Sequence, residues 1–261
     1  MSAVAQTSTR SPRVQAVRRL ARRSARVAEG RFVVEGPQAV REALPTLLEL
    51  YVEPDSHLEL VAAAPCPVTV VGPEVLAAMA QTVTPQGVLG VAALLDVPLE
   101  SALAGRPRLV AVLVTISDPG NAGTVIRTAD ASGAGAVVLT EGSTDPHGGK
   151  CVRATAGSLW HLPVVHGPTV AQTVDALRAA GLQVLATTAG GTDQLDELAD
   201  RGELAGPTAW LFGNEAAGLS AASLALADRT VRVPLFGRAE SLNLASAAAV
   251  CLYASARAQQ S

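Results

Sequence analysis

The sequence predicts an α/β protein of two domains, in which a small mixed domain precedes a larger parallel-sheet domain. Short apolar runs alternate with helical runs along most of the chain, which is the pattern of strands covered by helices. Residues 96–108 interrupt the pattern with two prolines and a glycine, which is typical of a linker. We therefore expect domains at residues 1–95 and 109–261.

The first domain is expected to begin with a basic helix. Residues 1–10 show no periodicity and are expected to be disordered, whereas Ser11 and Pro12 carry the signature of a helix start. We expect this helix to run to about Arg26. Strands are expected after it at 31–34, 50–52, 67–71 and 88–95, and helices near 38–49, 56–63 and 74–81.

The second domain shows mostly near-continuous apolar strands, as expected for parallel strands covered on both faces. In such sheets, ligands bind beyond the carboxyl ends of the strands, so polar loops there are candidate sites. Strands are expected at 109–116, 136–140, 162–165, 183–187, 208–212 and 231–235, and helices at 122–132, 150–159, 169–180, 194–200 and 242–257.

The composition limits the class of protein. Hydrophobic residues make up 49% of the chain, but no run reaches the roughly 18 uninterrupted apolar residues of a membrane span. The N-terminus has arginines without an apolar run behind them, so no secretory signal is expected. Cys66, Cys151 and Cys251 lie far apart, which predicts neither disulfides nor a metal site. A reducing cytoplasm is the expected location.

The charge is distributed unevenly. Residues 1–31 carry eight arginines and one acid, although the net charge of the chain is −3. Such an arginine-rich arm predicts a polyanionic partner, because guanidinium groups match phosphate geometry. The alternative is a solvated tail. The candidate RNA contacts are Arg13, Arg18, Arg19, Arg22, Arg23 and Arg31.

The first candidate loop contains Asn121, Gly123 and Arg127 after the strand expected at 109–116. Asn121 is expected to cap the helix that follows, with Arg127 about a turn and a half further on. The alternative is a simple cap with a surface ion pair between Arg127 and Asp130. Such a pair on one face of a helix stabilises the helix by only about a few tenths of a kcal/mol.

The second candidate loop carries Asn214 and Glu215 between Gly213 and Gly218. Glycines allow a ligand to lie against the backbone, and Glu215 places a carboxylate at the strand end. The alternative is a plain turn with a solvated acid.

The third candidate loop leads into an alanine-rich helix. Ser241 stands where an N-cap is expected, and Asn243 is expected in the first turn. A capped core helix is the simpler interpretation, and it is compatible with ligand binding.

Taken together, the three loops resemble a known family. The patterns NxGxxxR at 121–127, FGNExxGL at 212–219 and VPLxGxxxSLNLASAAA at 233–249 are similar to motifs 1, 2 and 3 of the SpoU (TrmH-like) family. Its members are RNA 2′-O-ribose methyltransferases of the SPOUT superfamily. Residues 12–14, 31–36 and 84–87 resemble the substrate-binding domain that often precedes the catalytic one.

This resemblance implies S-adenosylmethionine as the cofactor, held in a deep trefoil knot, and a homodimer formed through helices of the knot domain. It implies ribosomal (23S) RNA as the substrate ahead of transfer RNA, and no metal. The implied cofactor contacts are Thr187, Ala189, Gly213, Asn214, Val233, Leu235, Ser241 and Leu242. The implied catalytic residues are Asn121, Arg127, Glu215, Ser241 and Asn243.

The role of Arg127 has two interpretations. The resemblance implies a general base, but a guanidinium is effectively always protonated in proteins. We therefore expect Arg127 to clamp a phosphate and stabilise the developing oxyanion, while Asn121 and Asn243 orient the ribose. Glu215 and Ser241 are expected to support the site through hydrogen bonds.

Three alternatives remain at the level of function. A tRNA 2′-O-methyltransferase would carry the same motifs. A non-catalytic RNA-binding ribosome-assembly factor would keep the fold without the reaction. An enzyme that uses another adenine nucleotide on a Rossmann sheet is disfavoured, because neither GxGxxG nor GxxxxGK[ST] follows the first strand of either domain.

Overall fold

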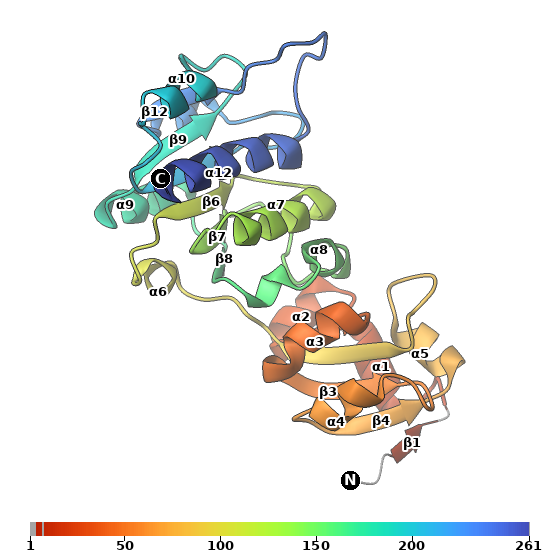
Figure 1. Cartoon of the computed structure of the whole chain (residues 1–261). Helices are drawn as coiled ribbons and strands as arrows, with labels where there is room; N and C mark the ends of the chain where they lie inside the picture. Colours follow the sequence, from red (N-terminus) through yellow and green to blue (C-terminus); the bar gives the residue numbers. More distant parts are fainter. Residues whose placement is uncertain (1–3, 7, 261) are drawn as a thin grey trace. The chain divides into compact units, whose positions relative to one another are not determined.

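The computed structural model describes residues 4–6 and 8–260 and divides the chain into two compact units (Figure 1). Unit 1 contains the chain up to Leu95 together with His147–Trp160, and unit 2 contains Asp96–Pro146 and the chain from His161 onward. The segment 147–160 was expected within the second domain, whereas here it groups with unit 1. The expected linker at 96–108 contains a short helix, α6 (Leu99–Leu103), and belongs to unit 2.

Unit 1 is built on a mixed five-stranded sheet in the order β1-β4-β3-β5-β2. Strand β5 runs antiparallel to β2 and β3, and the other pairs are parallel. The strands are β1 (Val4–Gln6), β2 (Arg31–Glu35), β3 (Leu47–Val52), β4 (Val68–Val71) and β5 (Val88–Ala93). The expectation of disorder over residues 1–10 is wrong for 4–6, because this segment pairs with β4 and forms an edge strand of the sheet. Residues 1–3 and 7 lie outside the described part of the chain.

Two helices replace the single basic helix that the sequence predicted. Helix α1 ends at Arg19 and helix α2 begins at Arg23. Arg26 is only 5% exposed and donates to the carbonyl oxygens of Leu20 and Ala21, at 2.8 and 3.0 Å. Its guanidinium thereby satisfies carbonyls that follow the end of α1. The helices of unit 1 are α1 (Pro12–Arg19), α2 (Arg23–Glu29), α3 (Pro37–Ala43), α4 (Leu58–Ala63), α5 (Pro73–Met79) and α8 (Gly149–Thr155), with 3₁₀ turns at Leu44–Thr46 and Ser158–Trp160.

The segment 147–160 is anchored in unit 1 at both ends. The ring of Phe32 on β2 lies 4.7 Å from the ring of His147 and 6.0 Å from that of Trp160, measured between centroids. The indole of Trp160 donates to the hydroxyl of Thr46, and the amide of Leu95 donates to the His147 ring. Aromatic packing and hydrogen bonds together explain why this segment belongs to unit 1 and not to unit 2.

Unit 2 contains the expected parallel sheet, in the order β10-β12-β9-β11-β6-β7-β8. All of its strand pairs are parallel, which confirms the predicted fold class. The strands are β6 (Leu109–Leu113), β7 (Ala136–Leu139), β8 (Val164–His166), β9 (Gln183–Thr187), β10 (Asp193–Gln194), β11 (Thr208–Phe212) and β12 (Arg229–Arg232). The helices are α6, α7 (Pro119–Ala131), α9 (Val170–Ala179), α10 (Leu195–Asp200), α11 (Ala221–Ala225) and α12 (Leu244–Gln260).

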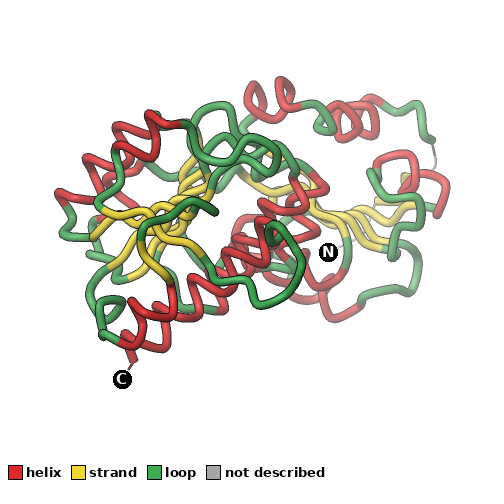
Figure 2. The backbone as a smooth tube through the Cα atoms, turned by 90° about the horizontal axis from the view of Figure 1, so that it is seen from above, coloured by secondary structure: helices red, strands yellow, loops and turns green. Residues whose placement is uncertain are grey.

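Helices cover both faces of this sheet, so its strands are buried on both sides (Figure 2). Helices α6 and α9 pack with Val110 and Val112 of β6 in one core cluster. Helix α12 lies against β6 and β11 and beside α7. The indole of Trp210, which is fully buried, donates to the hydroxyl of Ser255 on α12 at 2.9 Å. The continuous apolar runs of the sequence reflect this two-sided burial.

Three strands are followed by loops at the carboxyl edge of the sheet. These are β6, β11 and β12, and the loops are 114–118, 213–219 and 233–243. Strand β12 ends at Arg232 instead of the expected residue 235, so a long loop precedes α12 (blue in Figure 1). The trefoil knot stays a prediction. Among the described residues, no helix has the length and apolar character to cross a membrane.

Candidate active site

The carboxylate of Glu215 joins the first two loops. It accepts from the backbone amide and hydroxyl of Ser117 at 3.3 and 3.1 Å, and from the amide of Asp118 at 3.1 Å. It also accepts from the side-chain amide of Asn121 at 3.2 Å. Glu215 therefore fixes the start of α7 against the loop after β11.

These donors also control the ionisation of Glu215. Partial burial acts to raise the pKa of this carboxyl, but hydrogen bonds from its own backbone, from Asn121 and from the amides of Asp118 and Ser117 outweigh it. The pKa of Glu215 is lowered as a result. An acid that remains ionised and has its oxygens occupied by donors is a poor proton acceptor, so its role is to hold Asn121 in place.

Asn214 and Gly213 fix the turn of the second loop. The Asn214 side-chain amide donates to the carbonyl of Thr115 at 2.8 Å, and its oxygen accepts from the amides of Ala216 and Ala217 at 3.0 and 3.2 Å. A Cβ at Gly213 would lie 2.4 Å from the carbonyl carbon of Gly218. Only glycine allows the two ends of this turn to approach so closely.

Asn243 connects the third loop to the first. Its side-chain amide donates to the Asn121 oxygen at 3.2 Å, so Glu215, Asn121 and Asn243 form one hydrogen-bonded chain that joins the second and third loops to the first turn of α7. Its own oxygen accepts from the amide of Ala245 at 2.8 Å. Asn243 thus caps α12, and the expected cap by Ser241 is wrong because the helix begins at Leu244.

The expected cap by Asn121 is also wrong. Helix α7 begins at Pro119, and Asp118 is its N-cap, with its carboxylate accepting from the Asn121 amide at 2.8 Å. Sequence reasoning missed Asp118 and Ser117 as members of the site. An acidic residue directly before proline is the signal that identifies such a cap, since proline favours the first helical position.

Next to this hydrogen-bonded chain, the loops enclose a cavity of about 170 Å³. All eight residues expected to contact the cofactor line it, including Ser241. Glu215 lines it as well, while Asn121 and Asn243 do not. Residues that the sequence analysis did not single out also line it, namely Thr188, Val231, Glu240, Leu244 and Ala247.

The cavity has the properties of a backbone cradle with an apolar wall. The loop that follows β9, residues 188–192, packs closely against β12. A Cβ at Gly191 in this loop would lie 2.5 Å from the backbone nitrogen of Arg232. Val231, Val233 and Leu242 supply apolar surface. These features suit a ligand that combines an adenosine with an aliphatic arm. The volume is below the roughly 300–1,000 Å³ of typical small-molecule pockets, so such a ligand requires the 233–243 loop to move or extends through the mouth.

Arg127 lies elsewhere on α7. It is exposed and lines a larger cavity of about 1290 Å³ formed with α10 and α12, and the described part of the chain gives it no hydrogen bond or ion pair. Asp130 pairs with His161 at 2.7 Å, so the alternative pair between Arg127 and Asp130 is wrong. The structure therefore does not bring Arg127 to Glu215 and Asn121.

The six arginines expected to contact RNA fall into two groups. Arg13, Arg19 and Arg31 form ion pairs with Glu29 or Glu49 within unit 1. The other three are exposed and have no ion pair among the described residues. These are Arg18, Arg22 and Arg23.

Comparisons with known proteins agree with the sequence motifs. The SpoU rRNA Methylase family matches residues 108–253, and the MRM3-like substrate binding domain matches residues 11–90. A 23S rRNA (guanosine(2553)-2′-O)-methyltransferase, RlmP, of Bacillus subtilis is 34% identical over 94% of this chain and 96% of its own length.

Two solved structures share the whole architecture. One is an AdoMet-bound rRNA methyltransferase from Sinorhizobium meliloti, with 32% identity, a TM-score of 0.87 and 97% of each chain covered. The other is the SpoU methyltransferase AviRb from Streptomyces viridochromogenes in complex with AdoMet, with 30% identity and a TM-score of 0.86, covering 97% of this chain and 99% of that one.

The fold, the three loops and these likenesses define one class of protein, an RNA-modifying methyltransferase. The chain belongs to the SpoU rRNA methylase family, and the family predicted from the sequence is confirmed. Among the residues that the structure describes, no group of three or more His, Cys, Asp or Glu side chains is arranged to hold a metal ion.

Proposed function

We propose that this protein transfers a methyl group from S-adenosylmethionine to a ribose 2′-hydroxyl of 23S ribosomal RNA, in the cytoplasm. One observation carries the proposal: eight residues from separate loops surround one cavity, beside a hydrogen-bonded chain of Glu215, Asn121 and Asn243. Membership of an rRNA methylase family and the names of the relatives support the substrate.

The side chains of the site have the tasks of alignment and charge stabilisation. Bound S-adenosylmethionine supplies a methyl group that is already electrophilic, because it is carried on a sulfonium. Asn121 is held by Glu215 on one side and by Asn243 on the other, so its orientation is fixed before RNA binds. Such fixed amides orient a ribose hydroxyl, and orientation contributes several kcal/mol, roughly, to a two-substrate reaction.

Arg127 is proposed to clamp a phosphate of the RNA. It is an exposed cation without an ion pair among the described residues, and its guanidinium fork matches a phosphate. The proton of the ribose hydroxyl then leaves to solvent or to a phosphate oxygen instead of to Arg127.

Unit 1 is proposed to bind the RNA backbone. Arg18, Arg22 and Arg23 are exposed on or between α1 and α2. Aromatic residues make up only 3% of the chain, so stacking of bases on aromatic rings contributes little. Affinity is therefore expected to fall steeply as the salt concentration rises.

A homodimer through the knot domain is proposed from the surface of α12. Val250 and Tyr253 are 44% and 68% exposed on this helix and line the same cavity as Thr124 of α7. Neighbouring exposed apolar side chains of this kind are typical of protein–protein interaction sites. Sedimentation of the wild type and of Tyr253→Asp measures the oligomeric state of each protein. A wild-type dimer that the substitution converts to a monomer supports the proposal, and a wild-type monomer refutes it.

The decisive experiment is transfer of tritium from labelled S-adenosylmethionine to RNA. We expect label on deproteinised 23S rRNA, little on bulk tRNA, and mapping of the product to a 2′-O-methyl by primer extension at low dNTP. Preferential labelling of tRNA favours the tRNA enzyme. Tight RNA binding without any transfer favours the non-catalytic assembly factor.

A further inference from the structure

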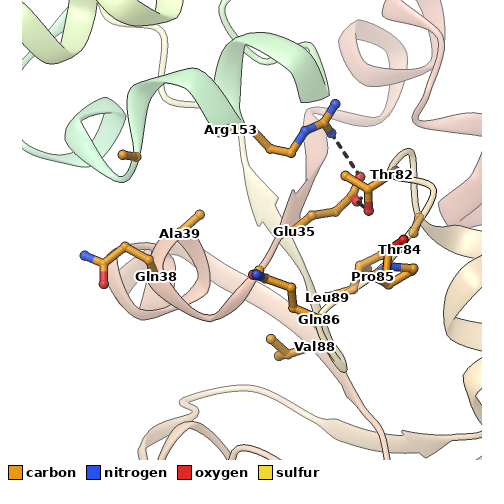
Figure 3. Close-up of a pocket in the computed structure, with 13 residues that line it drawn as sticks. Glu35, Gln38, Ala39, Thr82, Thr84, Pro85, Gln86, Val88, Leu89 and Arg153 are labelled. Carbon is orange, nitrogen blue, oxygen red and sulfur yellow. Dashed lines mark hydrogen bonds and ion pairs between the residues drawn. The ribbon is translucent and has the colours of Figure 1, made fainter.

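Unit 1 contains a cavity of its own, with a volume of about 350 Å³ (Figure 3). Its walls come from the β2–α3 junction, from the loop before β5 together with β5, and from α8. The buried residues Ala39, Val88 and Leu89 form an apolar inner wall. This volume lies within the roughly 300–1,000 Å³ of pockets that bind small molecules.

A buried carboxylate fixes the shape of this cavity. The Glu35 side chain is only 7% exposed and accepts from the amides of Gln81 and Thr82, at 2.8 and 3.1 Å, and from the Thr82 hydroxyl at 2.6 Å. Arg153 on α8 reaches the same carboxylate at 3.5 Å and balances its charge, as Figure 3 shows. The loop before β5 is thus held in place without a ligand, which reduces the ordering cost of binding.

The rim of the cavity presents donors and acceptors that the described structure does not use. No hydrogen bond engages the Gln86 carboxamide or the Thr84 hydroxyl in the described part of the chain, and Arg153 uses one guanidinium nitrogen for Glu35. Gln38, by contrast, donates to Glu42 on its own helix and points away from the other labelled side chains in Figure 3.

This combination selects the chemistry of the ligand. A carboxamide places a donor beside an acceptor, which matches the edge of a nucleobase. A guanidinium matches a phosphate. The inner wall is apolar, so a flat neutral ring fits it better than an ion does. Arg153 is 34% exposed and uses only one guanidinium nitrogen for Glu35, so its other donors are available to a phosphate.

We propose that this cavity takes one unstacked nucleotide of the RNA, with the base against Ala39 and Val88, its edge on Gln86 and its phosphate at Arg153. The inference rests on the proposed function for the identity of the ligand. It adds that unit 1 selects RNA by a splayed-out nucleotide as well as by charge, as sequence-specific RNA recognition commonly does. Arg153 and Ala156 lie within the methylase match, outside residues 11–90, so the site extends beyond the matched substrate-binding domain.

Two neighbouring positions provide a matched test. Thr84 lines the cavity, whereas Val83 is fully exposed and does not line it. We expect Thr84→Trp to fill the mouth and to raise the Kd and the KM for 23S rRNA about tenfold or more, since a good base contact contributes roughly 5- to 150-fold. Gln86→Ala is expected to act in the same direction. The kcat and the Kd for S-adenosylmethionine are expected to stay unchanged, and Val83→Trp to behave as the wild type.

Photocrosslinking locates the nucleotide directly. RNA that contains 4-thiouridine and 6-thioguanosine is expected to crosslink to residues 80–89, with the crosslink lost in Thr84→Trp and kept in Val83→Trp. Crosslinks only elsewhere, or equal RNA affinity of the two tryptophan variants, overturn the inference. If the wild type methylates the RNA in that case, the proposed function stands. If RNA binding depends on the cavity but no methyl is transferred, the proposed function fails and the inference stands.

Discussion

Substitution of Gly213 by alanine tests whether the cavity of unit 2 depends on close backbone approach. The added Cβ would lie 2.4 Å from the carbonyl carbon of Gly218 and 2.4 Å from the nitrogen of Leu219. Both atoms belong to the backbone, so the turn must move instead of a flexible side chain. Overpacking of this kind costs about 1–3 kcal/mol, which corresponds to a fall in Tm of roughly 2–12 °C for a protein of this size.

The displaced turn carries Gly213, Asn214 and Gly218, all of which line the cavity. We therefore expect the Kd for S-adenosylmethionine, measured by calorimetry, to rise at least tenfold, or about 1.4 kcal/mol. Gly206→Ala is the control, because its Cβ would meet open space at the other end of β11. A Gly213→Ala protein that binds and melts as Gly206→Ala does would falsify the argument that the backbone contact shapes the cavity.

Three further predictions follow from side chains of known environment. The pKa of Glu215 is lowered, so this carboxylate stabilises the fold above its ordinary pKa of 4.5, and the stabilisation is lost as the pH falls through the folded pKa. The difference in Tm between wild type and Glu215→Gln should therefore be constant from roughly pH 7 to pH 5.5 and should shrink in more acidic buffer. Arg127→Lys should keep most of kcat and an unchanged pH–rate profile, because lysine keeps the positive charge. It should raise the KM for RNA, because lysine lacks the fork that matches a phosphate. A fall of kcat to the background rate would favour the general-base role. Replacing Arg18, Arg22 and Arg23 together by glutamine should reduce the slope of log K against log salt by about 2, at roughly 0.7 per phosphate, and an unchanged slope would show that RNA lies elsewhere.

The sequence predicted the parallel sheet of unit 2 well because burial on both faces leaves continuous apolar runs. It also placed Gly213 and Ser241 beside the cavity that the structure shows, although the assignment of this cavity to the cofactor stays a prediction. The caps were wrong at Asn121 and Ser241, because several polar residues in each loop suit the N-cap position. Tertiary contacts separate the candidates in the first loop, where Asn121 donates to Glu215 and Asp118 takes the cap position.

The segment 147–160 shows why the grouping of elements was harder to predict than the elements themselves. A helix was expected at 150–159, and α8 forms at Gly149–Thr155. Its packing depends on Phe32, which is more than a hundred residues away and matches His147 and Trp160 only in three dimensions. A local pattern contains no information about such a partner.

The position of Arg127 connects the catalytic proposal to the proposed dimer. Six residues of α-helix rotate by about 600°, so Arg127 and Asn121 project about 120° apart around α7. It shares a cavity with Val250 and Tyr253, on the surface proposed to pair with a second copy. A monomeric Tyr253→Asp protein that keeps its affinity for S-adenosylmethionine but loses methyl transfer would show that Arg127 acts at the interface. If the monomer keeps its activity, Arg127 acts within one protomer, and the proposed connection between catalysis and the interface is refuted.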